Sequence, residues 1–134
     1  MDIIEAMAEA ILRFEGWFPA GTPGFPQGSR AWRKRNPGNL RPRPGEAADS
    51  GGYAIHPSLD VGWIKLKLRI GEYFGGAFGL SDKSTLVDFF NVYAPADDSN
   101  APALYATKVA SWITSYTGHQ IGANTTIGEL KALH

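Results

Sequence analysis

The chain has 134 residues, which is enough for about one domain with a hydrophobic core, and it contains no cysteine. The apolar share of 43% excludes a disordered chain, and 13 basic residues against 13 acidic ones leave no overall charge to attract nucleic acid or an anionic membrane. The lack of cysteine excludes disulfides, thiolate metal sites and a cysteine nucleophile.

The N-terminus is acidic and then amphipathic, which is not the pattern of a signal peptide. No apolar run approaches the roughly 20 residues that a membrane-spanning helix needs. The sequence therefore predicts a soluble protein with a single domain, residues 1–134.

Residues 2–14 have the periodicity of an amphipathic helix, with Gly16 as its C-terminal stop. The apolar positions recur every three or four residues, at Ile4, Met7, Ile11 and Phe14. Acidic and basic side chains occupy the opposite stripe.

The segment 16–52 is rich in glycine and proline and has little periodicity, so it is expected to be irregular, with short strands near Leu40 and Tyr53. Irregular segments of this length inside a compact domain are usually functional loops or disorder. The large aromatic residues Trp17, Phe18 and Trp32 argue against disorder.

The stretch 58–77 alternates locally like a strand between Ile64 and Ile70, but apolar residues also recur at helical spacing over a longer span. The length favours a helix, with Ser58 as its N-cap. A shorter helix is then expected from a cap at Ser84 or Asp82 through Tyr93, ended by Pro95.

Two more helices are expected toward the C-terminus. Ser99 or Asn100 opens the first, which has Pro102 in its first turn and Gly118 at its end. A capping box over 126–129 opens the second. The predicted fold class is mainly α (α+β), a helical domain with a loop-rich insertion after the first helix.

Glu15 departs from the pattern of its own helix. It lies eleven positions and about 20° from Ile4 around the helix axis, on the apolar face, whereas the other acids lie on the polar face. Desolvation there would raise the pKa of the carboxyl, and so would the negative end of the helix dipole. A carboxylic acid that keeps its proton near neutral pH can act as a general acid. A glutamate of the last turn that has no catalytic role and is bonded to a loop amide or to water would show the same sequence pattern.

The irregular segment 16–52 has three features that bear on Glu15 as a candidate catalytic acid. Asn36 and Asn39 flank Pro37-Gly38 in a tight turn, and their amides could bind sugar hydroxyl and N-acetyl groups or simply shape the turn. Flat aromatic faces for sugar rings could come from four residues that could equally be core, namely Trp17, Phe18, Trp32 and Tyr53. The segment also carries six basic residues and no acid before Gly45, which suits an anionic polymer or a solvated loop.

Several segments follow one another along the chain: Phe14-Glu15-Gly16-Trp17, then Arg35-Asn36-Pro37-Gly38-Asn39-Leu40-Arg41, then Thr85-Leu86 and Tyr93-Ala94-Pro95 through Asn100 and Tyr105. In this order, these segments resemble a lysozyme-like family of small domains from tailed bacteriophages and prophages. The resemblance spans about residues 4–109. Members of this family are often virion-associated and are taken to cut peptidoglycan.

This resemblance implies a lysozyme-like fold whose catalytic glutamate ends the first helix, which is Glu15 here. The implied reaction is cleavage of the β-1,4 bond between N-acetylmuramic acid and N-acetylglucosamine. Asn36 and Asn39 would line the cleft, and Tyr93 and Tyr105 would support its far wall.

The sequence departs from the usual pair of carboxylates in glycosidases. After Glu15, the next acidic residues are Glu46, Asp49 and Asp60. Either Glu46 or Asp49 returns to the cleft, as a muramidase would need, or one glutamate serves as acid and then base, as in lytic transglycosylases. The transglycosylase-like reaction with one glutamate is slightly favoured. Whether the product is hydrolysed or anhydro-ended stays open.

Two other classes compete with a glycosidase. One is a non-catalytic virion structural or wall-binding protein with the same fold, and the other is a nucleic-acid-binding domain, which the pI of 6.8 disfavours. The histidines His56, His119 and His134 fit no metal-ligand spacing, so no metal or cofactor is expected. The expected partners are glycan strands and phage tail or virion proteins. The expected location is the phage virion or the host cytoplasm before the protein reaches the wall.

Overall fold

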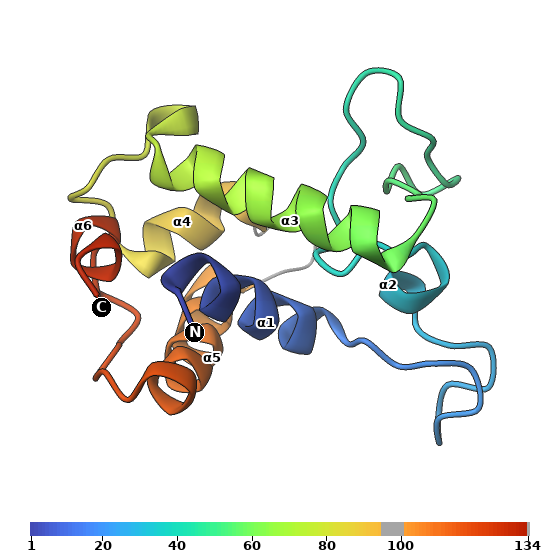
Figure 1. Cartoon of the computed structure of the whole chain (residues 1–134), viewed down its shortest axis with the longest axis horizontal. Coiled ribbons are helices and arrows are strands. Elements are labelled where there is room, and N and C mark those ends of the chain that lie inside the picture. The colour runs from blue at the N-terminus through green and yellow to red at the C-terminus, as the bar shows by residue number, and fades with distance from the viewer. Residues whose placement is uncertain (95–100, 134) are drawn as a thin grey trace. The chain divides into compact units, whose positions relative to one another are not determined.

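The computed structural model describes residues 1–94 and 101–133. Helices cover 51% of the described residues, which contain isolated β-bridges but no sheet (Figure 1). The mainly helical class is thereby confirmed. The strands expected near Leu40 and Tyr53 amount to one bridge between Ala48 and Ala54 and one hydrogen bond from Ala54 N to Leu40 O.

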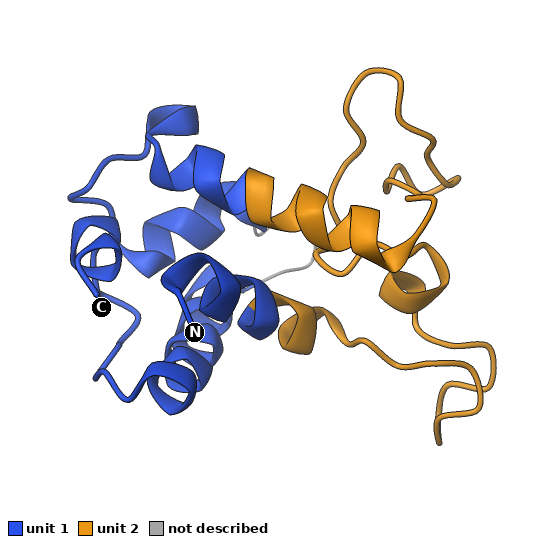
Figure 2. Cartoon of the chain, in the orientation of Figure 1, with its two compact units in different colours: residues 1–10, 69–134 blue, residues 11–68 orange. Residues whose placement is uncertain are grey.

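The chain divides into two compact units, which are coloured separately in Figure 2. Unit 1 comprises residues 1–10 and 69–134, and unit 2 comprises residues 11–68. Within the described ranges, no helix combines the length and the apolar character needed to cross a bilayer.

Helix α1 spans Ile3–Glu15 and confirms the helix predicted over 2–14. Asp2 caps it, because its Oδ1 accepts a hydrogen bond from Glu5 N at 2.9 Å. Gly16 ends the helix in a left-handed conformation (φ 80°) while its N–H still donates to Leu12 O. Glu15 is therefore the last helical residue, directly before the chain turns away.

Helix α3 spans Leu59–Phe74 and confirms the helical interpretation of 58–77, although it ends three residues earlier than expected. Ser58 is its cap, since Ser58 Oγ accepts from Val61 N at 3.2 Å. A short 3-10 helix, η1 (Ala77–Gly79), follows and was not predicted.

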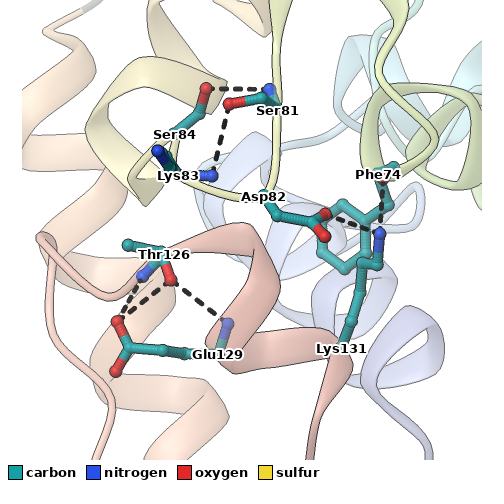
Figure 3. Close-up of polar contacts among 8 residues, drawn as sticks. All are labelled: Phe74, Ser81, Asp82, Lys83, Ser84, Thr126, Glu129 and Lys131. Carbon is teal, nitrogen blue, oxygen red and sulfur yellow. Dashed lines mark hydrogen bonds and ion pairs between the residues drawn. The ribbon is translucent and has the colours of Figure 1, made fainter.

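Helix α4 spans Leu86–Tyr93, and the predicted cap at Ser84 or Asp82 is wrong. Thr85 is the cap and forms a capping box with Asp88. Ser84 Oγ accepts instead from Ser81 N, and the Asp82 carboxylate pairs with Lys131 at 2.7 Å (Figure 3). The expected stop at Pro95 lies outside the described residues.

Helix α5 spans Pro102–Thr117. Pro102 occupies its first turn and Gly118 ends it in a left-handed conformation, both as predicted. Its N-cap is Ala101, which has no side-chain bond, and the two caps proposed from the sequence, Ser99 and Asn100, lie outside the described residues.

Helix α6 spans Ile127–Lys131 and begins with the predicted capping box, in which Thr126 Oγ1 accepts from Glu129 N and Glu129 Oε1 accepts from Thr126 N (Figure 3). In the same view, Lys131 Nζ also donates to Phe74 O, the last residue of α3. The starts of α4 and α6 are joined by a bridge between Thr85 and Thr126.

The core of unit 1 is aromatic where α4 packs on α5. Phe90 and Tyr105 are fully buried and their rings stack with centroids 4.2 Å apart. Phe89 is also fully buried and contacts Tyr73 and Phe74 edge to face. Such ring contacts add to the burial of their large apolar surface.

Unit 2 contains one short helix besides the ends of α1 and α3. Helix α2 (Arg30–Arg33) is a single turn and was not predicted, because one turn has no periodicity to detect. Ser29 caps it, and its Oγ accepts from Trp32 N and, at 3.0 Å, from Phe18 N. Phe18 in turn stacks on Phe25 with ring centroids 4.4 Å apart.

Candidate active site

The turn at residues 35–40 belongs to unit 2, and Asn36 holds it in place. The Asn36 side chain is fully buried and makes three hydrogen bonds to backbone groups. Its Nδ2 donates to Leu40 O and Ala54 O, both at 3.0 Å, and its Oδ1 accepts from Leu40 N at 2.9 Å. The amide expected to line a cleft thus has its hydrogen bonds within the turn, and we interpret Asn36 as the residue that shapes this turn.

Asn39 lies at the other end of the turn and contacts Glu15. Its Nδ2 donates to Glu15 Oε1 at 3.3 Å, across 24 positions of sequence. The backbone of Asn39 is left-handed (φ 48°), a conformation that asparagine tolerates better than most residues. Its Oδ1 is buried and accepts no hydrogen bond within the described residues.

Glu15 is partly exposed, as is Asn39. A carboxyl group in such a position is oriented by the protein and still open to a ligand. The contact therefore brings together the two residues that the sequence analysis proposed as the acid and as one cleft amide.

The start of the turn is held by Arg35, a residue that the sequence analysis did not single out. Arg35 has a left-handed backbone (φ 51°), and its Nε donates to His56 O at 2.8 Å. Helix α3 approaches this backbone at Gly62, where a Cβ atom would lie 2.1 Å from Arg35 O. A glycine inside a helical pattern signals such a close backbone approach and could have been read from the sequence.

Two of the four aromatic residues proposed to stack on sugars, Tyr53 and Trp32, have different surroundings. Tyr53 has the guanidinium carbons of Arg41 and Arg30 at 4.2 and 4.7 Å from its ring centroid, so a sugar ring that stacks there has to compete with these cations. Trp32 is partly exposed and lies directly over Gly28, where a Cβ atom would be 2.3 Å from the indole ring.

The two candidates for a second carboxylate are both bonded within their own loop. Glu46 Oε1 accepts from Arg43 N at 2.8 Å, and Oε2 pairs with Lys65 Nζ at 3.2 Å. The bond from the Arg43 amide, together with Lys65, holds the pKa of Glu46 below its usual range.

Asp49 is engaged in the same way. Its Oδ1 accepts from Tyr53 N at 3.0 Å and Gly51 N at 2.9 Å, and these amides lower the pKa of the Asp49 carboxyl. Both carboxylates therefore stabilise loop structure as anions.

Tyr93 and Tyr105 belong to unit 1, and their expected part in the far wall of a cleft stays a prediction. Their ring centroids are 6.2 Å apart, with Tyr105 fully buried and Tyr93 partly exposed. Within the described ranges, no group of three or more histidine, aspartate or glutamate side chains is arranged to hold a metal ion.

No protein-family model, curated protein or solved structure gives a significant match to this chain.

Proposed function

We propose that the protein is a lysozyme-like, peptidoglycan-cleaving glycosidase with Glu15 as its catalytic acid. The observation that carries this proposal is the hydrogen bond between Asn39 Nδ2 and Glu15 Oε1. It joins the segments 14–17 and 35–41, which are two parts of the resemblance to lysozyme-like phage domains. A general acid has to be held at a fixed place beside the bond it cleaves, and both the helix end and the Asn39 amide constrain Glu15 in that way.

The bonding of Glu46 and Asp49 favours a reaction with one carboxylate. Glu46 would have to leave Lys65 and the Arg43 amide, and Asp49 two backbone amides, before either could act as a base beside Glu15. We therefore favour the transglycosylase-like reaction over hydrolysis.

In that reaction Glu15 acts twice. Its carboxyl proton passes to the glycosidic oxygen as the bond from muramoyl C1 to that oxygen breaks. The resulting carboxylate then takes the proton of the muramoyl 6-hydroxyl while this oxygen attacks C1 and closes a 1,6-anhydro ring. The glutamate ends protonated again, and no water is consumed.

The same proposal makes the glycan strands of the wall the substrate, and phage tail or virion proteins the candidate partners. The resemblance favours delivery of the enzyme from a phage particle or from the host cytoplasm.

The decisive experiment is digestion of purified peptidoglycan with the wild type and with Glu15→Gln, followed by mass spectrometry of the muropeptides. Glutamine keeps the size and can still contact Asn39 but cannot donate a proton, so we expect a loss of about 10²–10⁴-fold or more. Glu9→Gln, on the polar stripe of the same helix, is the matched control and should keep full activity.

The products identify the reaction. Anhydro-ended muropeptides that depend on Glu15 would establish the transglycosylase, whereas reducing-end muramic acid would require a second carboxylate or an activated water. If the wild type leaves the wall intact over a range of pH and salt, the proposal fails. The protein would then be a non-catalytic wall-binding or virion structural protein.

A further inference from the structure

Unit 2 contains a pocket of about 470 Å³ that none of the roles proposed above uses. It lies beside the turn that carries Asn39 and is lined by the first residue of that turn, the loop at 45–47, residues 55–57 and two residues of α3. Its volume falls in the range of small-ligand sites. Its lining combines short apolar groups, among them Ala47, Ile55 and Val61, with the charged residues Arg35, Glu46 and Lys65.

Arg35 is held in this pocket with its terminal nitrogens available. Its Nε donates to His56 O, another lining residue, and so fixes the direction of the side chain. No oxygen of the described residues accepts a hydrogen bond from the two terminal nitrogens of Arg35. A guanidinium fork that is anchored at Nε is pre-organised for bidentate binding of an oxyanion.

Among the residues that the structure describes, the other charges of the pocket leave Arg35 without a counter-ion. Both carboxylate oxygens of Glu46 are engaged, one by the Arg43 amide and the other by Lys65. The pair of Glu46 and Lys65 is neutral overall, so the pocket carries a net positive charge at Arg35. The Lys65 ammonium, which pairs with Glu46, has further N–H groups that could donate to an incoming anion.

We propose that this pocket, the Arg35 pocket, binds the carboxylate of a short peptide with small apolar side chains. The guanidinium fork matches a planar carboxylate, and the apolar walls match methyl groups such as those of alanine. On the proposed function, on which this step rests, the peptide is the stem attached to the muramic acid residue. Because the turn 35–40 carries both Arg35 and Asn39, one rigid segment would position the peptide and the glycan together.

The test is calorimetric titration of the full chain with a stem pentapeptide, L-Ala-γ-D-Glu-L-Lys-D-Ala-D-Ala, and with the same peptide amidated at both carboxylates. The titration is made with Glu15→Gln, so that binding is measured apart from cleavage. We expect the free acid to bind at least tenfold more tightly than the amide, because charge-assisted bonds to Arg35 are lost in the amide.

Variants then assign the binding to Arg35. Arg35→Gln should weaken binding of the free acid about tenfold or more, and Arg35→Lys should not restore it, because lysine keeps the charge but not the fork. Lys65→Gln, which leaves the turn untouched, should weaken binding about threefold. Arg33→Gln, in the same basic segment but outside the pocket, should bind like the parent. Thermal unfolding of each variant checks that it is folded.

The proposal is overturned if the amidated peptide binds equally well, or if Arg35→Gln and Lys65→Gln both bind like the parent. It is also overturned if inorganic phosphate binds in an Arg35-dependent way and the peptide does not. Wall cleavage without peptide binding would refute the Arg35 pocket and leave the proposed function standing. Peptide binding without wall cleavage would keep the carboxylate site and refute its assignment to the wall.

Discussion

The two units of this protein are stabilised in different ways. In unit 1, helices α4 and α5 bury a continuous set of aromatic and aliphatic side chains, and capping boxes fix the starts of α4 and α6. In unit 2, much of the chain between α1 and α3 is irregular, and hydrogen bonds from single polar side chains to the backbone determine its path. Left-handed residues are also frequent there, at Gly16, Gly21, Gly24, Gly28, Arg35, Asn39, Gly45 and Gly52.

This difference has a consequence for mutation. Periodic burial distributes stability over many side chains, so the loss of one polar group on a helix surface is tolerated. A loop whose path depends on a few buried amides has no such redundancy, because each lost bond leaves backbone groups without partners. The proposed site around Glu15 and Asn39 lies in unit 2 and therefore depends on a loop of this kind.

The largest effect is expected for Asn36→Ala in unit 2. It removes three buried hydrogen bonds and leaves groups of Leu40 and Ala54 unsatisfied, which should cost about 2–5 kcal/mol of unfolding free energy. Denaturant unfolding measures the loss, and hydrogen exchange should show it at residues 36–56 first. Asn91→Ala, at an exposed position of α4, is the control and should change stability by no more than about 0.5 kcal/mol. Equal effects of the two substitutions would contradict the comparison.

The same contrast explains what the sequence could and could not predict. Helices α1, α3 and α6 follow from apolar spacing and from caps at their ends, which are local properties. The cap of α4 lies one residue after the predicted Ser84 and three after the predicted Asp82. Ser84 and Thr85 are both good caps, and the Asp88 side chain completes the capping box at Thr85.

In unit 2 the decisive interactions are not local. Glu15 and Asn39 were each identified from sequence, but their contact joins residues 24 positions apart through a segment without periodicity. A buried amide that binds backbone, as at Asn36, has the same sequence signature as one that binds a sugar. Gly62 signals that some backbone approaches α3 closely, but no local pattern identifies Arg35 as that backbone or His56 as its partner.

Alanine substitutions of two glycines in α3 are expected to change stability less, and with opposite signs in the two units. Gly62→Ala places a Cβ atom 2.1 Å from Arg35 O, so the turn has to shift, and we expect a loss of about 1–3 kcal/mol. Gly71→Ala, in the part of α3 that belongs to unit 1, meets no atom within 4 Å and should gain up to about 1 kcal/mol from helix propensity. Thermal unfolding of both variants measures the sign of each change in stability. A stabilising Gly62→Ala would show that the turn is not packed on α3.

The capping box of α6 sets the scale for a single polar interaction in unit 1. Thr126→Ala removes the acceptor of Glu129 N and should cost about 1 kcal/mol, while Thr126→Ser keeps the oxygen and most of the stability (Figure 3). Chemical denaturation of the two variants measures the difference. A loss as large as that of Asn36→Ala would remove the distinction between the two units.

The smallest effect is a difference in acid sensitivity. Backbone amides, that of Tyr53 at Asp49 and that of Arg43 at Glu46, hold both pKa values below the ordinary 3.8 and 4.5. A carboxyl whose pKa is lower in the folded state contributes stability above its unfolded pKa and loses it as the pH falls through the folded value. We therefore expect the loop 43–53 to lose hydrogen-exchange protection below about pH 4, before α5 does. Asp49→Asn keeps the acceptor oxygen but does not titrate, so it should make residues 49–53 less sensitive to acid. Simultaneous loss of protection in the loop and in α5 would mean that the two units unfold as one.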